Sequence, residues 1–148
     1  MSTRSNIAIL NKDGSCERIY CHWDGYPEYN GAILVKYYNK LNKVRELLRY
    51  GDLSYLDKKV SPETKSHSFD NPEKDVCVYY GRDRGENGVE KKVFPSFDEM
   101  YKDFEESWAE YLYVFDEEKN DWFFYVLYEN IKQNLKEYLE ITNHLEVK

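Results

Sequence analysis

Alternation of apolar and polar residues predicts a β-hairpin at the start of the chain. The pattern runs from Thr3 to Leu10 and again from Ser15 to Trp23, on either side of the turn sequence Asn11–Gly14. The apolar side of both strands consists of Ile7, Ile9, Ile19, Cys21 and Trp23. Successive side chains of a strand point to opposite faces, so we expect this side to join the core. The opposite face then carries Arg4, Asn6, Arg18, Tyr20 and His22.

The pattern then changes to helical spacing. Apolar residues predict a helix from Asn30 to about Arg49, with an interruption between Asn39 and Asn42 and a stop at Gly51. The short stretch Asp52–Leu56 predicts a turn or a single helical turn. The polar stretch Lys58–Asp75 has no period, which predicts a long surface loop.

Two short strands are expected after this loop. Val76–Tyr80 forms the first strand, Gly81–Gly88 is a turn-rich loop, and Val89–Phe94 is a candidate partner strand. Ser96, with Glu99 three residues later, predicts the capped start of another helix.

The last third of the chain predicts a buried hairpin and a final helix. Tyr111–Phe115 and Trp122–Tyr128 are apolar throughout, which is typical of strands covered on both faces. Glu129–Ile141 has helical spacing. The whole pattern predicts one α+β domain over residues 1–148, with a mostly antiparallel sheet and helices packed on it.

Charge is distributed unevenly along the 148 residues. Residues 1–95 contain 16 basic and 14 acidic residues (+2), whereas residues 96–148 contain 5 and 14 (−9). A duplex-binding protein needs a dense basic stripe, so we expect no duplex nucleic acid as a partner. The acidic last third is either a solvated face or a DNA-like surface that occupies a nucleic-acid-binding protein.

Cysteine usage and hydropathy indicate a compartment. Three cysteines without framework spacing favour a reducing environment. The chain has no apolar run of roughly 18 residues and no apolar signal-peptide core at its start, so we expect a cytoplasmic protein without a membrane span.

The first candidate site is the segment Tyr20-Cys21-His22-Trp23-Asp24-Gly25-Tyr26-Pro27. Tyr20 and His22 fall on the strand face opposite the core, where rings are able to stack on a flat ligand. Tyr26 is a loop aromatic and therefore a better binding candidate than a strand aromatic. Trp23 falls on the apolar side, so we expect it in the core rather than in a site.

The second candidate site is the segment Tyr79-Tyr80-Gly81-Arg82-Asp83-Arg84-Gly85-Glu86. It is either a solvated turn with a weak surface ion pair or an anion-binding loop. Arginine suits planar, bidentate contacts with phosphate, and the flanking glycines permit positive φ. We interpret Arg82 and Arg84 as phosphate ligands, Tyr80 as a stacking ring, and Asp83 as a residue that orients one arginine.

Catalytic and metal-binding patterns are weak. Cys21, His22, Asp24, His67 and Cys77 are potential ligands, but none has a paired zinc spacing. Cys21 and His22 point to opposite faces of one strand and therefore form no dyad. We expect no cofactor, no metal and no catalytic residue.

Several stretches of this chain resemble a family of small proteins encoded by phages and prophages. The matching stretches lie in about the first 90 residues and are Thr3–Ile9, Tyr20–Pro27, Asn30-Gly31, Gly51–Ser54 and Tyr80–Glu86. The family is similar in turn to phage sponges that sequester the cyclic-nucleotide signals of bacterial CBASS immunity. That likeness implies ligand binding without turnover, and it carries no binding residue over to this sequence.

The leading hypothesis is therefore a protein that sequesters a cyclic di- or trinucleotide immune signal. Its ligand-binding residues would be Arg82, Arg84, Tyr80, His22, Tyr26, Tyr20 and Arg4. Such a small binding protein is expected to act as a homo-oligomer. Two alternatives stay open: an acidic interaction protein that inhibits a host nuclease or CRISPR effector, and a phosphodiesterase that degrades the same signals.

Overall fold

The computed structural model describes residues 2–142, which form one mixed sheet with helices on both faces. Residue 1 and residues 143–148 of the predicted domain lie outside this range. The eight strands found within it are β1 (Ser5–Leu10), β2 (Cys16–Cys21), β3 (Leu53–Tyr55), β4 (Val78–Tyr79), β5 (Lys92–Phe94), β6 (Tyr111–Asp116), β7 (Asp121–Val126) and β8 (Gln133–Asn134).

The sheet order is β4-β3-β2-β1-β6-β7-β8. Strand β5 pairs with Cys16–Arg18 at the start of β2, whereas β3 pairs with Cys21 at its end. Strand β1 is parallel to β6, and β2 is parallel to β3 through the pair Cys21 and Leu53. The remaining named pairs are antiparallel, including β1 with β2 and β6 with β7. The predicted α+β class with a mostly antiparallel sheet is confirmed.

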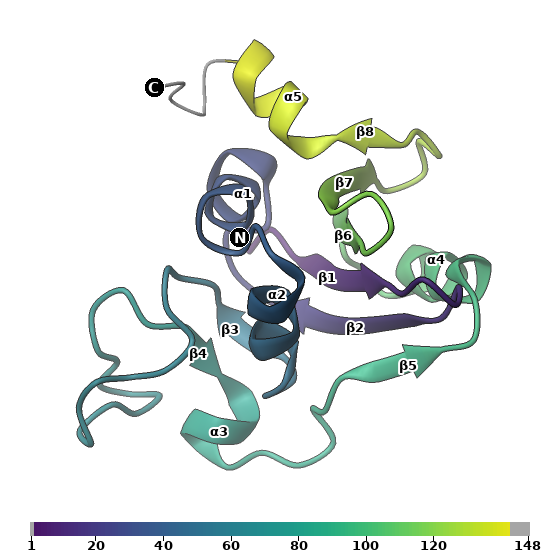
Figure 1. The fold of residues 1–148 in the computed structure, drawn as a ribbon. Coiled ribbons are helices and arrows are strands. Elements are labelled where there is room, and N and C mark those ends of the chain that lie inside the picture. The colour runs from purple at the N-terminus through teal and green to yellow at the C-terminus, as the bar shows by residue number, and fades with distance from the viewer. Residues whose placement is uncertain (1, 143–148) are drawn as a thin grey trace.

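Helices cover both faces of this sheet (Figure 1). They are the π-helical turn η1 (Pro27–Gly31) and the α-helices α1 (Ala32–Tyr37), α2 (Leu41–Leu48), α3 (Tyr80–Arg84), α4 (Phe97–Glu106) and α5 (Leu135–Ile141). Figure 1 shows α2 lying across β1 and β2, with the long loop before β4 at the side of the molecule beside α3. No helix among residues 2–142 has the length and apolar character to cross a bilayer.

Strand alternation separates two hydrophobic cores. Ile7, Ile9 and Ile19 face α1, α2 and α5 in the larger core. Ala8 and Cys16 face the opposite way and pack with apolar residues of α4 in the smaller one. By the same alternation Tyr20 and His22 lie on the α4 face of β2. Asn6, the cross-strand partner of Tyr20, donates a hydrogen bond to the C-cap residue Ser107 of α4 at 3.4 Å.

Three predictions about elements are confirmed in outline. The hairpin β1–β2 forms with the expected faces, and the Ser96 hydroxyl caps α4 by accepting a hydrogen bond from the Glu99 amide at 3.2 Å. The helix expected from Asn30 to Arg49 is interrupted near the predicted place, because α1 ends at Tyr37 and α2 begins at Leu41.

Four other expectations about elements are wrong. The partner strand expected for Val76–Tyr80 over Val89–Phe94 is β5 (Lys92–Phe94), which pairs with β2 instead. The stretch Asp52–Leu56 is not a turn, because Leu53–Tyr55 is held as strand β3 between β2 and β4. The loop expected over Gly81–Gly88 begins with one helical turn, α3, which Gly85 ends at φ 76°. The helix expected from Glu129 starts only at Leu135, since Gln133 and Asn134 pair with β7.

Candidate functional site

Asp52 joins the two segments that carry the candidate residues. Its carboxylate accepts a hydrogen bond from the Tyr20 amide at 2.9 Å, and its carbonyl accepts one from the Tyr80 amide at 3.2 Å. Burial raises the pKa of Asp52, although the Tyr20 amide and Arg18 both act to lower it. Asp52 therefore holds the end of β2 beside the start of α3, although Tyr20 and Tyr80 are about sixty positions apart in the sequence.

Gly51 makes this junction possible. Its φ is 81°, and a Cβ atom there would lie 2.2 Å from the Val89 carbonyl oxygen. The next amide, that of Asp52, donates to the same oxygen at 2.8 Å. Only glycine combines the left-handed backbone with so close an approach.

The first half of the site is a group of rings at the end of β2. The Tyr20 hydroxyl and His22 Nδ1 are 2.7 Å apart, and the Trp23 ring meets the His22 ring edge to face at 4.8 Å. Burial raises the pKa of Tyr20 to about 12, and burial and nearby Arg4 lower the pKa of His22. Tyr20 thus keeps its proton at neutral pH, and when it donates to Nδ1, the His22 Nε2 atom is left as an N–H donor.

The second half of the site lies on α3 and the long loop. The Tyr80 ring lies 5.7 Å from the Phe69 ring, and the Arg84 guanidinium lies over both, at 5.1 and 4.2 Å from their centroids. Arg84 Nε also donates to Glu86 at 2.6 Å, in a pair whose two side chains are 48% and 38% exposed. Exposed ion pairs contribute little, so Arg84 is able to exchange Glu86 for another anion.

The two halves meet at Tyr80. Tyr80 adds to the rise in the pKa of Tyr20 that burial causes, while Arg4 opposes it, so Tyr80 and Arg4 each lie within electrostatic reach of Tyr20. We call this surface the motif face. It consists of Arg4, Tyr20, His22, Trp23, Phe69, Tyr80 and Arg84.

Arg82 points into the protein. Its guanidinium donates to the carbonyl oxygens of Val60 and Cys77 and to both carboxylate oxygens of Asp83. It also lies 4.7 Å from the centroid of the Tyr79 ring. These contacts occupy most of its five N–H donors. The position of Arg82 therefore suits an internal anchor better than the phosphate ligand that we expected from the sequence.

Asp83 completes this anchor. It accepts a hydrogen bond from the Tyr79 amide at 2.8 Å and lies 3.3 Å from His67 Nε2. Burial acts to raise the pKa of Asp83, but Arg82, the Tyr79 amide and His67 together hold it below its ordinary value. His67 Nδ1 in turn accepts the Glu73 amide at 2.9 Å. The network ties the long loop to α3 and so places Phe69 beside Tyr80.

Two aromatic residues lie elsewhere than expected. Trp23 is 44% exposed rather than in the core, because β2 ends at Cys21 and the chain turns at Asp24, whose φ is 57°. Tyr26 precedes η1, and its ring contacts Tyr29 at 6.4 Å instead of the rings of the motif face.

Sequence reasoning missed three contributors to the site: Asp52, Trp23 and Phe69. The apolar alternation that predicted a buried Trp23 ignored the turn that follows it. Phe69 is the one Phe, Tyr or Trp in the polar loop Lys58–Asp75, and a single aromatic residue in such a loop is itself an indication of a binding site.

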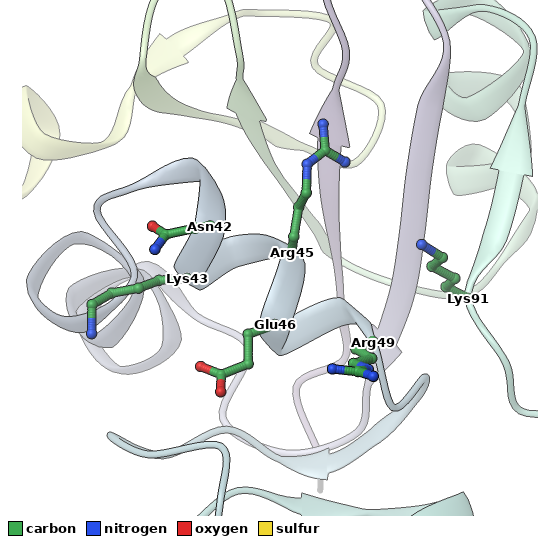
Figure 2. A pocket seen from close by; sticks show the side chains of 6 residues that line it. All are labelled: Asn42, Lys43, Arg45, Glu46, Arg49 and Lys91. Atoms are coloured by element: carbon green, nitrogen blue, oxygen red, sulfur yellow. The ribbon is translucent and has the colours of Figure 1, made fainter.

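The hollow shown in Figure 2 is basic, and two of the four cations that line it, Arg45 and Lys91, form salt bridges. It measures about 680 Å³ and is lined by Asn42, Lys43, Arg45, Glu46, Arg49 and Lys91. Arg45 and Lys91 both bind Glu17, at 2.8 and 2.6 Å. Burial acts to raise the pKa of Glu17, yet Lys91, Asn11 and Arg45 lower it. We interpret part of this hollow as an ion-pair cluster in which Glu17 of β2 holds Arg45 of α2 and Lys91.

Metal ligands are not grouped in residues 2–142: no three His, Cys, Asp or Glu side chains there are placed to hold one ion. Comparisons of the chain with models of protein families, with curated proteins and with solved structures find no match.

Proposed function

We propose that the protein binds a nucleotide-like anion on the motif face and does not turn it over. The observation that carries the proposal is the junction at Asp52, which holds Tyr20 beside Tyr80 although they are sixty positions apart in the sequence. We take these rings, together with Arg4 and Arg84, as one binding surface. Flat rings suit bases, and arginines suit phosphates.

The partly exposed groups divide into two roles. Trp23, His22 and Tyr80 offer ring surfaces for bases, and Arg4 and Arg84 supply positive charge. Of the described residues, Arg84 has its one ion pair with exposed Glu86, and Arg4 has none. Arg4 and Arg84 therefore replace the pair Arg82 and Arg84 as the phosphate ligands.

The available interactions match a micromolar ligand. Stacking contributes about 1–3 kcal/mol per base and a charge-assisted hydrogen bond about 1.5–3 kcal/mol. Two stacked bases and two arginine contacts therefore gross roughly 5–12 kcal/mol before the cost of association. A micromolar dissociation constant corresponds to about −8 kcal/mol. Tighter binding needs further burial, for which a second subunit is the source we propose.

Binding without covalent catalysis is favoured by the state of the nearby nucleophiles. Cys21 is fully buried, and burial raises the pKa of its thiol to about 12. The Tyr20 hydroxyl, with its pKa also raised to about 12, is engaged with His22. Neither group is an activated nucleophile at neutral pH.

The biological setting rests on the phage-family resemblance. In that setting the ligand is a cyclic di- or trinucleotide immune signal, and the protein is a cytoplasmic sponge made during infection. A sponge returns its ligand intact when it is denatured, whereas a phosphodiesterase returns products.

Isothermal titration calorimetry with a panel of cyclic di- and trinucleotides tests the proposal. We expect one panel member to bind in the micromolar range or tighter, and Arg84→Ala to weaken that binding about tenfold or more. Arg49→Ala is the matched control, because Arg49 is an exposed arginine of the α2 hollow. No heat with any nucleotide contradicts the proposal, and recovery of cleaved nucleotide contradicts the absence of turnover.

A further inference from the structure

Two large aromatic side chains are exposed at one end of the β6–β7 hairpin. Trp108 is 80% exposed and Tyr128 is 73% exposed, whereas Trp122 of the same hairpin is 2% exposed. Neither ring has a ring partner among residues 2–142. Exposed aromatic residues of this size are more typical of interfaces than of a free surface.

Backbone pairing brings the two loops together. Tyr111 of β6 pairs with Val126 of β7, and beyond them the Leu127 amide donates to the Glu110 carbonyl oxygen at 2.9 Å. Trp108 precedes this junction and Tyr128 follows it. Both residues have φ near 67°, a backbone conformation that is uncommon for bulky residues. Each of the two rings is therefore carried on a turn of defined backbone conformation.

The residues next to these rings in the sequence are acidic. Glu105, Glu106 and Glu110 flank Trp108, and Glu129 follows Tyr128. Within residues 2–142, none of these four carboxylates takes part in a salt bridge. The segment Glu105–Glu110 contains no basic residue. These carboxylates disfavour phosphate, so this surface differs in charge from the motif face, which it adjoins where the Glu110 amide donates to the Arg4 carbonyl oxygen at 2.9 Å.

We propose that the Trp108–Tyr128 surface docks a protein that presents a basic, arginine-containing patch. Tryptophan and tyrosine are the residues that most often anchor interfaces, and an arginine guanidinium stacks well on a tryptophan ring. The glutamates next to Trp108 and Tyr128 in the sequence complement such a cation and steer its approach. The proposal concerns a second surface of the protein and does not depend on nucleotide binding.

Fluorescence anisotropy of a labelled peptide rich in arginine and leucine tests this proposal. We expect saturable binding that weakens as salt is raised, and no binding of the same peptide with glutamate in place of arginine. Trp108→Ala should weaken binding about tenfold or more, and the double variant Glu106→Gln/Glu110→Gln should weaken it and reduce its salt dependence. Glu118→Gln is the matched control, since Glu118 is an exposed glutamate in the turn at the other end of the hairpin.

The outcomes are distinct. Absence of arginine-peptide binding, or wild-type affinity in Trp108→Ala, overturns the proposal. Because Trp108 is exposed, circular dichroism should show the fold unchanged, and Trp108→Phe should retain most of the affinity. Nucleotide titration of Trp108→Ala provides a second readout: unchanged nucleotide affinity is expected, and a matching loss would assign Trp108 to the ligand site instead.

Discussion

Replacing the two arginines of the second motif separately should destabilise the protein by clearly different amounts. Arg82 is 19% exposed and bonds to Asp83, which is 4% exposed, and to the Val60 and Cys77 carbonyl oxygens. Removing one partner of a buried ion pair costs about 3–5 kcal/mol, and the partial exposure of Arg82 places Arg82→Ala near the lower limit. The Arg84 pair is half exposed, so Arg84→Ala should cost at most about 1 kcal/mol.

Urea unfolding followed by circular dichroism measures this difference. With a slope of about 2 kcal/mol per molar urea, a loss of 3 kcal/mol lowers the midpoint by roughly 1.5 M, and a loss of 1 kcal/mol by roughly 0.5 M. Arg82→Lys keeps the charge but not the fork of donors, so it should fall between wild type and Arg82→Ala. Equal midpoints for Arg82→Ala and Arg84→Ala would refute the assignment of Arg82 as an internal anchor.

Three further results are expected from stability measurements. Asp52→Ala should lower the free energy of unfolding by about 1–3 kcal/mol, because the Tyr20 amide loses its acceptor. Asp52→Asn keeps an acceptor at this position. Because the raised pKa of Asp52 makes its buried charge unfavourable as pH rises, Asp52→Asn should be at least as stable as wild type in urea unfolding at neutral pH. Gly51→Ala should lower the thermal midpoint by the equivalent of about 2 kcal/mol, since its Cβ would meet the Val89 carbonyl at 2.2 Å, and an unchanged midpoint would argue against that approach. The lowered pKa values of Asp83 and Glu17 mean that the folded state holds their protons less tightly than the unfolded state. The free energy of unfolding should therefore fall as pH drops below about 4. Glu17→Gln should make this fall with pH less steep.

Sequence patterns predicted those helices and strands that are determined by residues close together in the sequence. The β1–β2 hairpin follows from strict alternation on both sides of a turn, and the start of α4 follows from a cap in which Ser96 and Glu99 are three residues apart. Strand β3 could not be predicted this way, because three residues show no period. Its pairing with Cys21 on one side and Tyr79 on the other makes it a strand.

The candidate site was predicted in part for the same reason. Tyr20, His22 and Arg4 were placed together because one hairpin face determines their positions. The inward direction of Arg82 depends on the carbonyl oxygens of Val60 and Cys77, and a backbone acceptor leaves no mark in a sequence. Tertiary contacts of this kind appear only in the folded chain.

The most direct test of the motif face is an amide chemical-shift titration of the folded protein with the cyclic-nucleotide panel. The account predicts shifts concentrated at Tyr20–Trp23 and Tyr80–Arg84, with the amides of α2 unchanged. Shifts confined to α2 and the hollow of Figure 2, or none with any nucleotide, would contradict it.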